Sequence, residues 1–242
     1  MVSVPEIRKF REEVDGICDF RDRILIEVLY LLAARVSEVS SKTCPSLLKL
    51  NFTKPYGALM TWDIKEYNEG KVKEKALLVT SAVAKRTKRS EVWNQAVKDL
   101  SEKTLEPELK KKAWMAFGQE KATFKVIALP VKPEFEPWTL DLLKWLKHHG
   151  TLSFPLTQSR ILQIVKQDLH RLDPHITAHK LRHYRITHLI SEYGFTPYQV
   201  VTYAGWSFRS ANQGMGFGGA GQFDIYVHLQ WRDYFPRLLQ SV

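Results

Sequence analysis

Residues 22–39 constrain the fold more than any other stretch of the chain. Their spacing is helical, and apolar side chains occupy more than half of the circumference of the expected helix. A helix that is apolar on most sides is buried, so we expect this one to lie in the interior. The stretch ends in Ala-Ala-Arg-Val-Ser-Glu-Val, which places Arg35 and Glu38 three positions apart. A charged pair beside such an apolar helix is either a structural ion pair or part of a functional site.

The charge of the chain indicates its class of partner. Lysine and arginine number 36 against 26 aspartates and glutamates, a net charge of +10. An excess of this size indicates a nucleic acid or an anionic membrane surface. No apolar run reaches the roughly 20 residues of a membrane-spanning helix, and the charged N-terminus does not resemble a signal peptide. The two cysteines make neither a disulfide framework nor a metal set. We therefore expect a soluble, cytoplasmic protein with a polyanionic partner and no membrane contact.

Alternating apolar residues predict a small antiparallel sheet of about three strands. The strands are expected at residues 58–64, 76–84 and 123–131. The highly charged segment 86–122 separates the last two strands. We expect it to be an insertion at the tip of a hairpin, because the apolar runs on either side would pair well without it.

Helical spacing dominates the rest, so the expected fold is α+β and mostly α-helical, in a single domain spanning residues 1–242. Residues 1–21 are expected to form a helical extension. Thr196-Pro197-Tyr198-Gln199 has the pattern of a capping box with proline in the first turn, and Gly205 is placed to end that helix. Residues 208–222 include five glycines and predict a loop. Further apolar residues at helical spacing are Ile7, Phe10, Val14, Leu140, Leu143, Leu146, Ile161, Val165, Leu169, Leu172 and, in a final helix over 223–239, Ile225, Leu229, Tyr234 and Leu238.

Residues 177–188 combine the residue types that a phosphate-handling site needs. Thr177 can cap a helix through its hydroxyl. His179 and Arg182 then leave the same face, which sets a proton-transfer group beside a planar phosphate clamp. Leu181, Tyr184, His188 and Leu189 follow the spacing of a neighbouring, more apolar face. The alternative is a solvated basic helix with one or two histidines in the core.

The histidines of this region also suggest zinc, because His-x3-His can bind a metal on a helix. His175, His179, His183 and His188 lie close together in the sequence. No cysteine or carboxylate stands at a spacing that would complete the ligand set, and the HExxH pattern is absent. We expect no metal and no cofactor.

Four elements occur in the order Arg35, His179-x-x-Arg182-His183, Gly205-Trp206-Ser207 and Tyr226-Val227-His228. In this order the chain, from about residue 20 onward, resembles the tyrosine recombinase (phage integrase-like) family. The resemblance implies cleavage and rejoining of double-stranded DNA through a 3′-phosphotyrosyl link, without metal or ATP. It also implies a DNA-associated protein that forms a tetramer on DNA, whereas the free catalytic domain can be a monomer.

The resemblance assigns a role to each matching residue. Tyr226 would be the nucleophile, Arg35 and Arg182 would bind the scissile phosphate, and His179 would transfer a proton. Trp206 takes the position of a histidine or tryptophan in the family. A lysine would protonate the leaving 5′-oxygen, and here Lys85 is the better match and Lys88 the second. The supporting residues would be Glu38 and His183, and the DNA-binding residues Arg86, Lys88, Arg89 and Lys180.

The chain departs from the family in the interval between Trp206 and Tyr226, which is 20 positions and longer than usual. A long tether would permit cleavage in a partner's site, or Tyr234 could be the nucleophile instead. The N-terminal DNA-clamping domain of the family is not expected here, because only about 20 residues precede the matching pattern. Two other functions stay open: relaxation of DNA as by a type IB topoisomerase, and DNA binding without catalysis.

Overall fold

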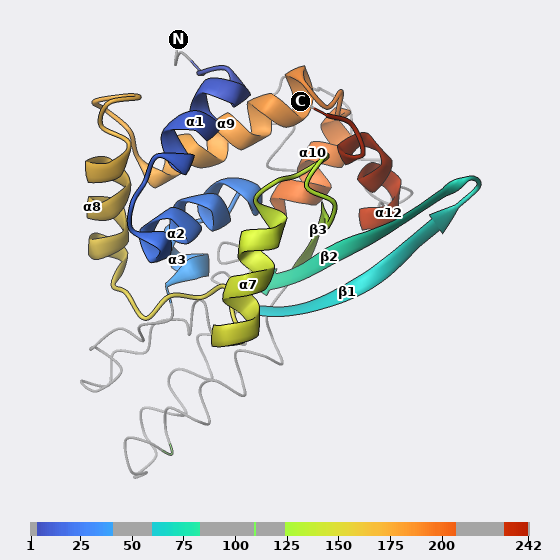
Figure 1. The fold of residues 1–242 in the computed structure, drawn as a ribbon, viewed down its shortest axis with the longest axis horizontal. Coiled ribbons are helices and arrows are strands. Elements are labelled where there is room, and N and C mark those ends of the chain that lie inside the picture. Colours follow the sequence, from blue (N-terminus) through green and yellow to red (C-terminus); the bar gives the residue numbers. More distant parts are fainter. Residues whose placement is uncertain (1–3, 41–59, 83–108, 110–123, 207–229, 242) are drawn as a thin grey trace, which may run out of the picture.

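The computed structural model describes residues 4–40, 60–82, 109, 124–206 and 230–241, and every structural statement below concerns these residues. Helix α2 (Phe20–Leu31) lies in the middle of the fold, with α1 and α9 on one side and α7 and the sheet on the other (Figure 1). Asp19 caps its N-terminus by accepting from the Asp22 backbone N–H. Every residue from Ile24 to Ala34 is buried, so the prediction of a buried helix is confirmed.

The fold is α+β, as predicted, and consists of helices around one three-stranded antiparallel sheet. Its elements are α1 (Ile7–Asp15), α2, α3 (Val36–Val39), β1 (Met60–Glu69), β2 (Val72–Ala82), β3 (Phe124–Pro130), α7 (Thr139–His149), α8 (Gln158–Asp168), α9 (Ala178–Ser191), α10 (Pro197–Ala204), α12 (Trp231–Tyr234) and the 3-10 helix η3 (Phe235–Leu238). None of the described helices is long and apolar enough to cross a membrane.

The prediction of one helix over 22–39 is wrong, because the chain breaks between α2 and α3. Ala33 has a φ of +41°, a left-handed conformation that an L-residue rarely adopts. Arg35 is the N-cap of α3, with an extended backbone. Arg35 and Glu38 are therefore the cap and third residue of a new helix.

The sheet has the order β1-β2-β3. Gly70, with a φ of +59°, lies in the two-residue turn between Glu69 and Val72, which are paired across the hairpin. The first strand was predicted to end at residue 64, but it continues to Glu69. Alternating apolar residues do not mark residues 65–69, because most side chains of this part of β1 face solvent. This part lies on a hairpin that projects from the body of the fold (Figure 1).

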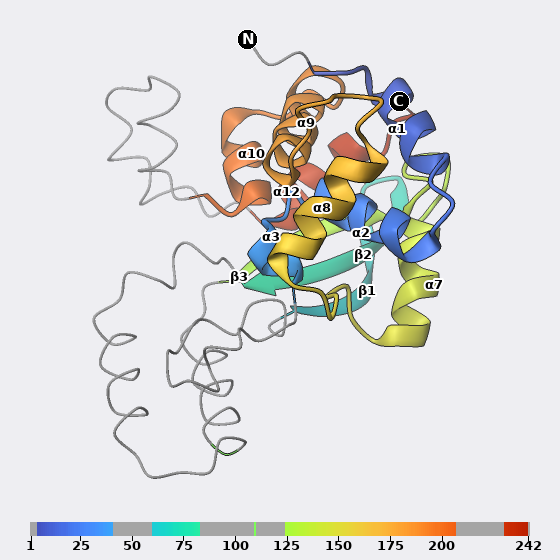
Figure 2. The same ribbon diagram turned by 90° about the vertical axis from the view of Figure 1, so that its left-hand side faces the viewer.

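Strands β2 and β3 are antiparallel neighbours, with Ala82 paired to Phe124. The connection between them contains the predicted insertion 86–122, which lies outside the described residues apart from Leu109. The predicted loop 208–222 also lies outside them. Figure 2 shows α8 in front of α2, where it packs against α3.

The predicted helix ends are confirmed. The Thr177 hydroxyl accepts from the Lys180 N–H, Thr196 and Gln199 form the capping box, and Gly205 ends α10 with a φ of +65°. The last predicted helix, over 223–239, is described only from residue 230 onward, where α12 and then the 3-10 helix η3 take its place. Ile225 and Leu229 lie outside the described residues, and the predicted apolar faces within them are confirmed with one exception. On α7 Leu140 is exposed, because Leu142, Trp145 and Leu146 form the buried face instead. The N-terminal extension is helical only over Ile7–Asp15, and the buried residues are Ile7, Phe10 and Val14.

Candidate functional site

The break between α2 and α3 holds a charged pair in a fixed position. The Glu38 carboxylate is fully buried and accepts from the backbone N–H of Arg35 and from its guanidinium, each at 3.0 Å. The Arg35 side chain keeps 27% of its surface exposed. A buried carboxylate that binds both the backbone and the side chain of one arginine fixes the direction of that guanidinium.

A second cation reaches the same carboxylate from the sheet. Lys125 on β3 donates from Nζ to the Leu32 carbonyl at 2.9 Å and lies 3.4 Å from Glu38 Oε2. Its side chain is only 2% exposed. The sequence reasoning missed this residue, although a signal exists. Lys125 is in phase with Ile127 and Leu129 on the buried face of β3, where a lysine is unusual.

Arg182 on α9 joins this cluster from the other side. Its guanidinium donates to the carbonyl of Ala33 and, at 2.8 Å, to that of Ala204. The Trp206 ring centre lies 5.6 Å from the guanidinium carbon. Arg182 is 2% exposed and links the end of α2 to the end of α10. The strained residue Ala33 therefore directs its carbonyl at Arg182. Strained backbone is common at functional sites.

The charges of this cluster do not balance. Arg35, Lys125 and Arg182 are three cations around the single carboxylate of Glu38. Burial lowers the pKa of Arg182 to about 10, assisted by Arg35 and opposed by Glu38. Burial likewise lowers the pKa of Lys125 to about 8, against the attraction of Glu38. Lys125 and Arg182 therefore stay mostly protonated at neutral pH, and with Arg35 and Glu38 these four described residues carry two net positive charges in a mostly buried setting.

The pKa of Glu38 shows the same excess of positive charge. Burial alone would raise it, but Lys125, Arg182 and Arg35 outweigh burial, and the pKa is lowered. The carboxylate is therefore ionised at neutral pH. An anion bound between the arginines would balance the cluster, and tetrahedral oxyanions suit planar guanidinium donors.

Two histidines lie on the solvent side of α9. His179 and His183 are exposed, and their Nε2 atoms are 3.0 Å apart. One imidazole must donate and the other accept at that distance, so both cannot be cations in this geometry. Partial burial, His183, Arg182 and Arg35 lower the pKa of His179. His179 is thus a neutral imidazole near Arg182, available for proton transfer.

Another buried arginine, Arg185, lies three positions further along α9 in a different environment. It donates to the Tyr203 hydroxyl at 3.2 Å and lies 3.8 Å from Glu136. The rings of Tyr30, Tyr193 and Tyr203 surround it, with centres between 5.2 and 5.6 Å from its guanidinium carbon. Burial alone would lower the pKa of Arg185, but the tyrosines and Glu136 outweigh it, and the pKa is raised.

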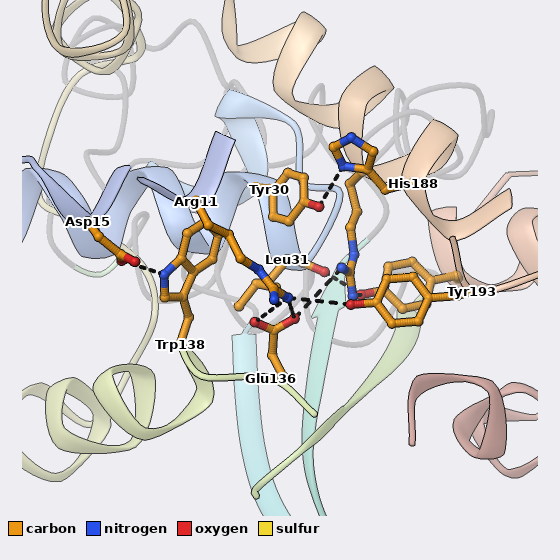
Figure 3. Close-up of polar contacts among 10 residues, drawn as sticks. Arg11, Asp15, Tyr30, Leu31, Glu136, Trp138, His188 and Tyr193 are labelled. Carbon is orange, nitrogen blue, oxygen red and sulfur yellow. Dashed lines mark hydrogen bonds and ion pairs between the residues drawn. The ribbon is translucent and has the colours of Figure 1, made fainter. Parts of the chain in front are cut away.

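His188 belongs to this second cluster (Figure 3). Its Nε2 lies 2.8 Å from the Pro5 carbonyl and its Nδ1 lies 2.8 Å from the Tyr30 hydroxyl. A carbonyl can only accept, so Nε2 carries the proton and Nδ1 accepts from Tyr30. Arg11 and Glu136 close the cluster with an ion pair at 3.1 Å. These contacts join α1, α2, α9 and the chain before α7, and they are structural.

The structure brings together five of the residues predicted for the site: Arg35, Glu38, His179, Arg182 and Trp206. His183 contacts His179, as described. Lys180 pairs with Asp173 at 2.7 Å. Five predicted residues lie outside the described part of the chain: Lys85, Arg86, Lys88, Arg89 and Tyr226. Among the described residues no group of three histidine, cysteine or acidic side chains could hold a metal.

Tyr234, the alternative nucleophile, is a core residue. It is 0% exposed, and its hydroxyl donates to the Val126 carbonyl at 3.0 Å and accepts from the Ala128 N–H at 3.1 Å. Burial raises its pKa. A buried hydroxyl that binds two backbone groups of β3 cannot reach a DNA phosphate in this fold.

No protein-family model matches the chain, and no curated protein and no solved structure matches it either.

Proposed function

We propose that the chain is a DNA strand transferase of the tyrosine recombinase kind, which cleaves and rejoins double-stranded DNA without metal or ATP. One observation carries the proposal. Arg35 and Arg182, which are far apart in the sequence, converge on a cluster with two net positive charges. Arg182 is buried and Arg35 is partly buried, and among the described residues Glu38 is the acid that acts on Arg182. Two guanidiniums with this excess of positive charge suit a phosphodiester, whose charge increases when the phosphorus is attacked.

The proposed reaction follows from these groups. The Tyr226 oxygen attacks the scissile phosphorus, the bond to the 5′-oxygen breaks, and a 3′-phosphotyrosyl link forms. Arg35 and Arg182 stabilise the non-bridging oxygens, with the Trp206 N–H as a further donor. His179 takes the tyrosine proton, and a lysine, assigned to Lys85, protonates the leaving 5′-oxygen. Because the link conserves the bond energy, a 5′-hydroxyl can reverse the reaction without ATP.

The partner in this proposal is double-stranded DNA, in keeping with the net charge of +10. Recombination would require four protomers on two DNA sites, and the protein would be DNA-associated in the cytoplasm. Cleavage alone requires one complete site and is the simpler activity to test.

The test needs no known DNA site. Wild-type and Tyr226→Phe protein are incubated without metal with nicked, sheared DNA of the source organism, and covalent adducts are separated on a denaturing gel. We expect an adduct from the wild type alone, and sequencing of the trapped DNA would then give the site. An adduct from both proteins would assign the nucleophile to another residue. DNA binding without an adduct from either protein would favour a catalytically silent DNA-binding protein, and relaxation of any plasmid would favour a topoisomerase.

A further inference from the structure

The carbonyl end of α2 is held by side chains from three other elements. The consecutive carbonyls of Leu31, Leu32 and Ala33 accept from Tyr203, Lys125 and Arg182, which lie on α10, β3 and α9. The C-terminal carbonyls of a helix carry partial negative charge, so cations and hydroxyl donors are stabilising there. Of these three side chains only Lys125 also contacts Glu38.

Burying the charge of Lys125 costs free energy that its contacts must offset. A lysine side chain that is 2% exposed loses most of its hydration. The Glu38 carboxylate already has a cation, because Oε1 accepts from Arg35. Lys125 therefore adds a charge that the fold does not need for neutralisation, and it adds that charge at the second oxygen of the group that orients Arg35.

We propose that Lys125 is a positioning residue of the anion site, which holds Glu38 against the α2–α3 break so that Arg35 is directed at a bound tetrahedral oxyanion. This inference rests on the proposed function only in taking the oxyanion to be a DNA phosphate. Lys125 acts through Glu38 and Arg35 and does not touch the anion. Its removal leaves Glu38 Oε2 without its lysine and allows the carboxylate and Arg35 to move together.

The test uses sulfate, a tetrahedral dianion that does not change its charge between pH 6 and 9. The full chain is labelled with ¹⁵N-arginine and titrated with sulfate at constant ionic strength, while the Nε–H signals of Arg35 and Arg182 are followed. In the wild type both signals should shift with the same dissociation constant. In Lys125→Met we expect binding to weaken about tenfold, with the Arg35 shift most reduced.

A double-mutant cycle separates positioning from direct contact. If Lys125 acts through Arg35, Arg35→Ala and Arg35→Ala/Lys125→Met should bind sulfate equally weakly. A double variant weaker than Arg35→Ala would mean that Lys125 contacts the anion itself and would overturn the positioning role. Wild-type affinity in a folded Lys125→Met protein would overturn it too. Lys132→Met is the matched control, because Lys132 is exposed and pairs with Glu74 outside the site.

The wild type provides a second measurement in case Lys125→Met does not fold. The charged groups that face Lys125 are Glu38 and Arg35 at the α2–α3 break and Arg182 on α9. Glu38 stays ionised and Arg182 stays largely protonated between pH 7 and 9, whereas Lys125 loses its proton. Sulfate affinity should fall several-fold over this range, and an unchanged affinity would overturn the inference. If sulfate binds as expected but no DNA adduct forms, the proposed strand-transfer chemistry is refuted, whereas the positioning role of Lys125 stands.

Discussion

Arg182 and Arg185 are the same residue type on the same helix, three positions apart and almost equally buried, at 2% and 0% exposure. Their neighbours differ. Arg182 contacts backbone carbonyls and lies near Arg35 and Lys125, and its pKa is lowered to about 10. Arg185 lies among three tyrosine rings and Glu136, and its pKa is raised.

The comparison shows that burial alone does not identify a functional arginine. Buried charges are normally paired, and Arg185 follows that rule with Glu136. Arg182 instead belongs to a cluster in which three described cations surround one described carboxylate. The balance of charge separates the two arginines more clearly than their exposure does.

The largest effect is expected at Arg182. Arg182→Ala should reduce covalent adduct formation at least about a thousandfold, because a donor to the transition-state oxygens is lost. DNA binding, measured by fluorescence anisotropy, should stay nearly unchanged, because many other basic residues contribute to it. Equal loss of adduct and binding would show that Arg182 serves affinity and not the chemical step.

Arg185 should show the opposite pattern. Arg185→Met should lower the free energy of unfolding by about 3 kcal/mol, because it leaves the buried Glu136 with Arg11 alone. Urea denaturation measures this change, and adduct yield per folded molecule should be retained. The exposed Arg8 provides the control, and Arg8→Met should change stability by less than about 0.5 kcal/mol. A stable Arg185→Met protein would contradict the structural role.

Glu27 extends the comparison to a buried acid. It is 0% exposed, Arg23 Nε lies 3.5 Å from its Oε1 without a hydrogen bond, and burial outweighs Arg23 and raises the pKa of Glu27 to about 9. The folded protein thus keeps a proton that the unfolded chain releases above pH 4.5. Stability from this group is complete below that pH and is lost as the pH rises through 9.

Glu27→Gln should remove this dependence. At pH 9 the variant should be more stable than the wild type by a few kcal/mol, and at pH 5 the two should be nearly equal. Thermal melts across this range measure the difference, with the exposed Glu12→Gln as control. A parallel pH profile for wild type and Glu27→Gln would show that Glu27 is ionised in the fold.

Tyr234 gives the smallest effect. Tyr234→Phe should cost about 1–2 kcal/mol, because the Val126 carbonyl and the Ala128 N–H lose their hydroxyl partner. Its adduct yield should equal that of the wild type, whereas Tyr226→Phe should give no adduct. Loss of the adduct in Tyr234→Phe at unchanged stability would contradict the structural role of this tyrosine.

The sequence predicted those features that depend on neighbouring residues. The Thr177 cap, the Thr196–Gln199 box and the Gly205 helix end are local, and all were found. The α2–α3 break was missed because it depends on distant contacts. Arg182 holds the Ala33 carbonyl from α9, and Lys125 holds the Leu32 carbonyl from β3. No pattern within 22–39 carries that information.

The site was predictable where residue spacing alone places side chains together. His179 and Arg182 lie within one helical turn, and the resemblance added Arg35, Glu38 and Trp206, which the fold brings to them. Neither residue spacing nor the family resemblance pointed to Lys125. Its contact with Glu38 joins residues far apart in the chain, and only its phase within β3 distinguished it from the other lysines.

The most direct test of the different roles of these two arginines compares Arg182→Lys with Arg185→Lys, measuring adduct yield per folded molecule and melting temperature for each. Both substitutions keep the charge and remove the planar fork of donors. We expect Arg182→Lys to lose the adduct at least about a hundredfold per folded molecule, and to melt earlier because the Ala33 and Ala204 carbonyls lose a donor. Arg185→Lys should melt earlier and keep its adduct yield. The same pattern in both variants would contradict the division of α9 into a catalytic arginine and a structural one.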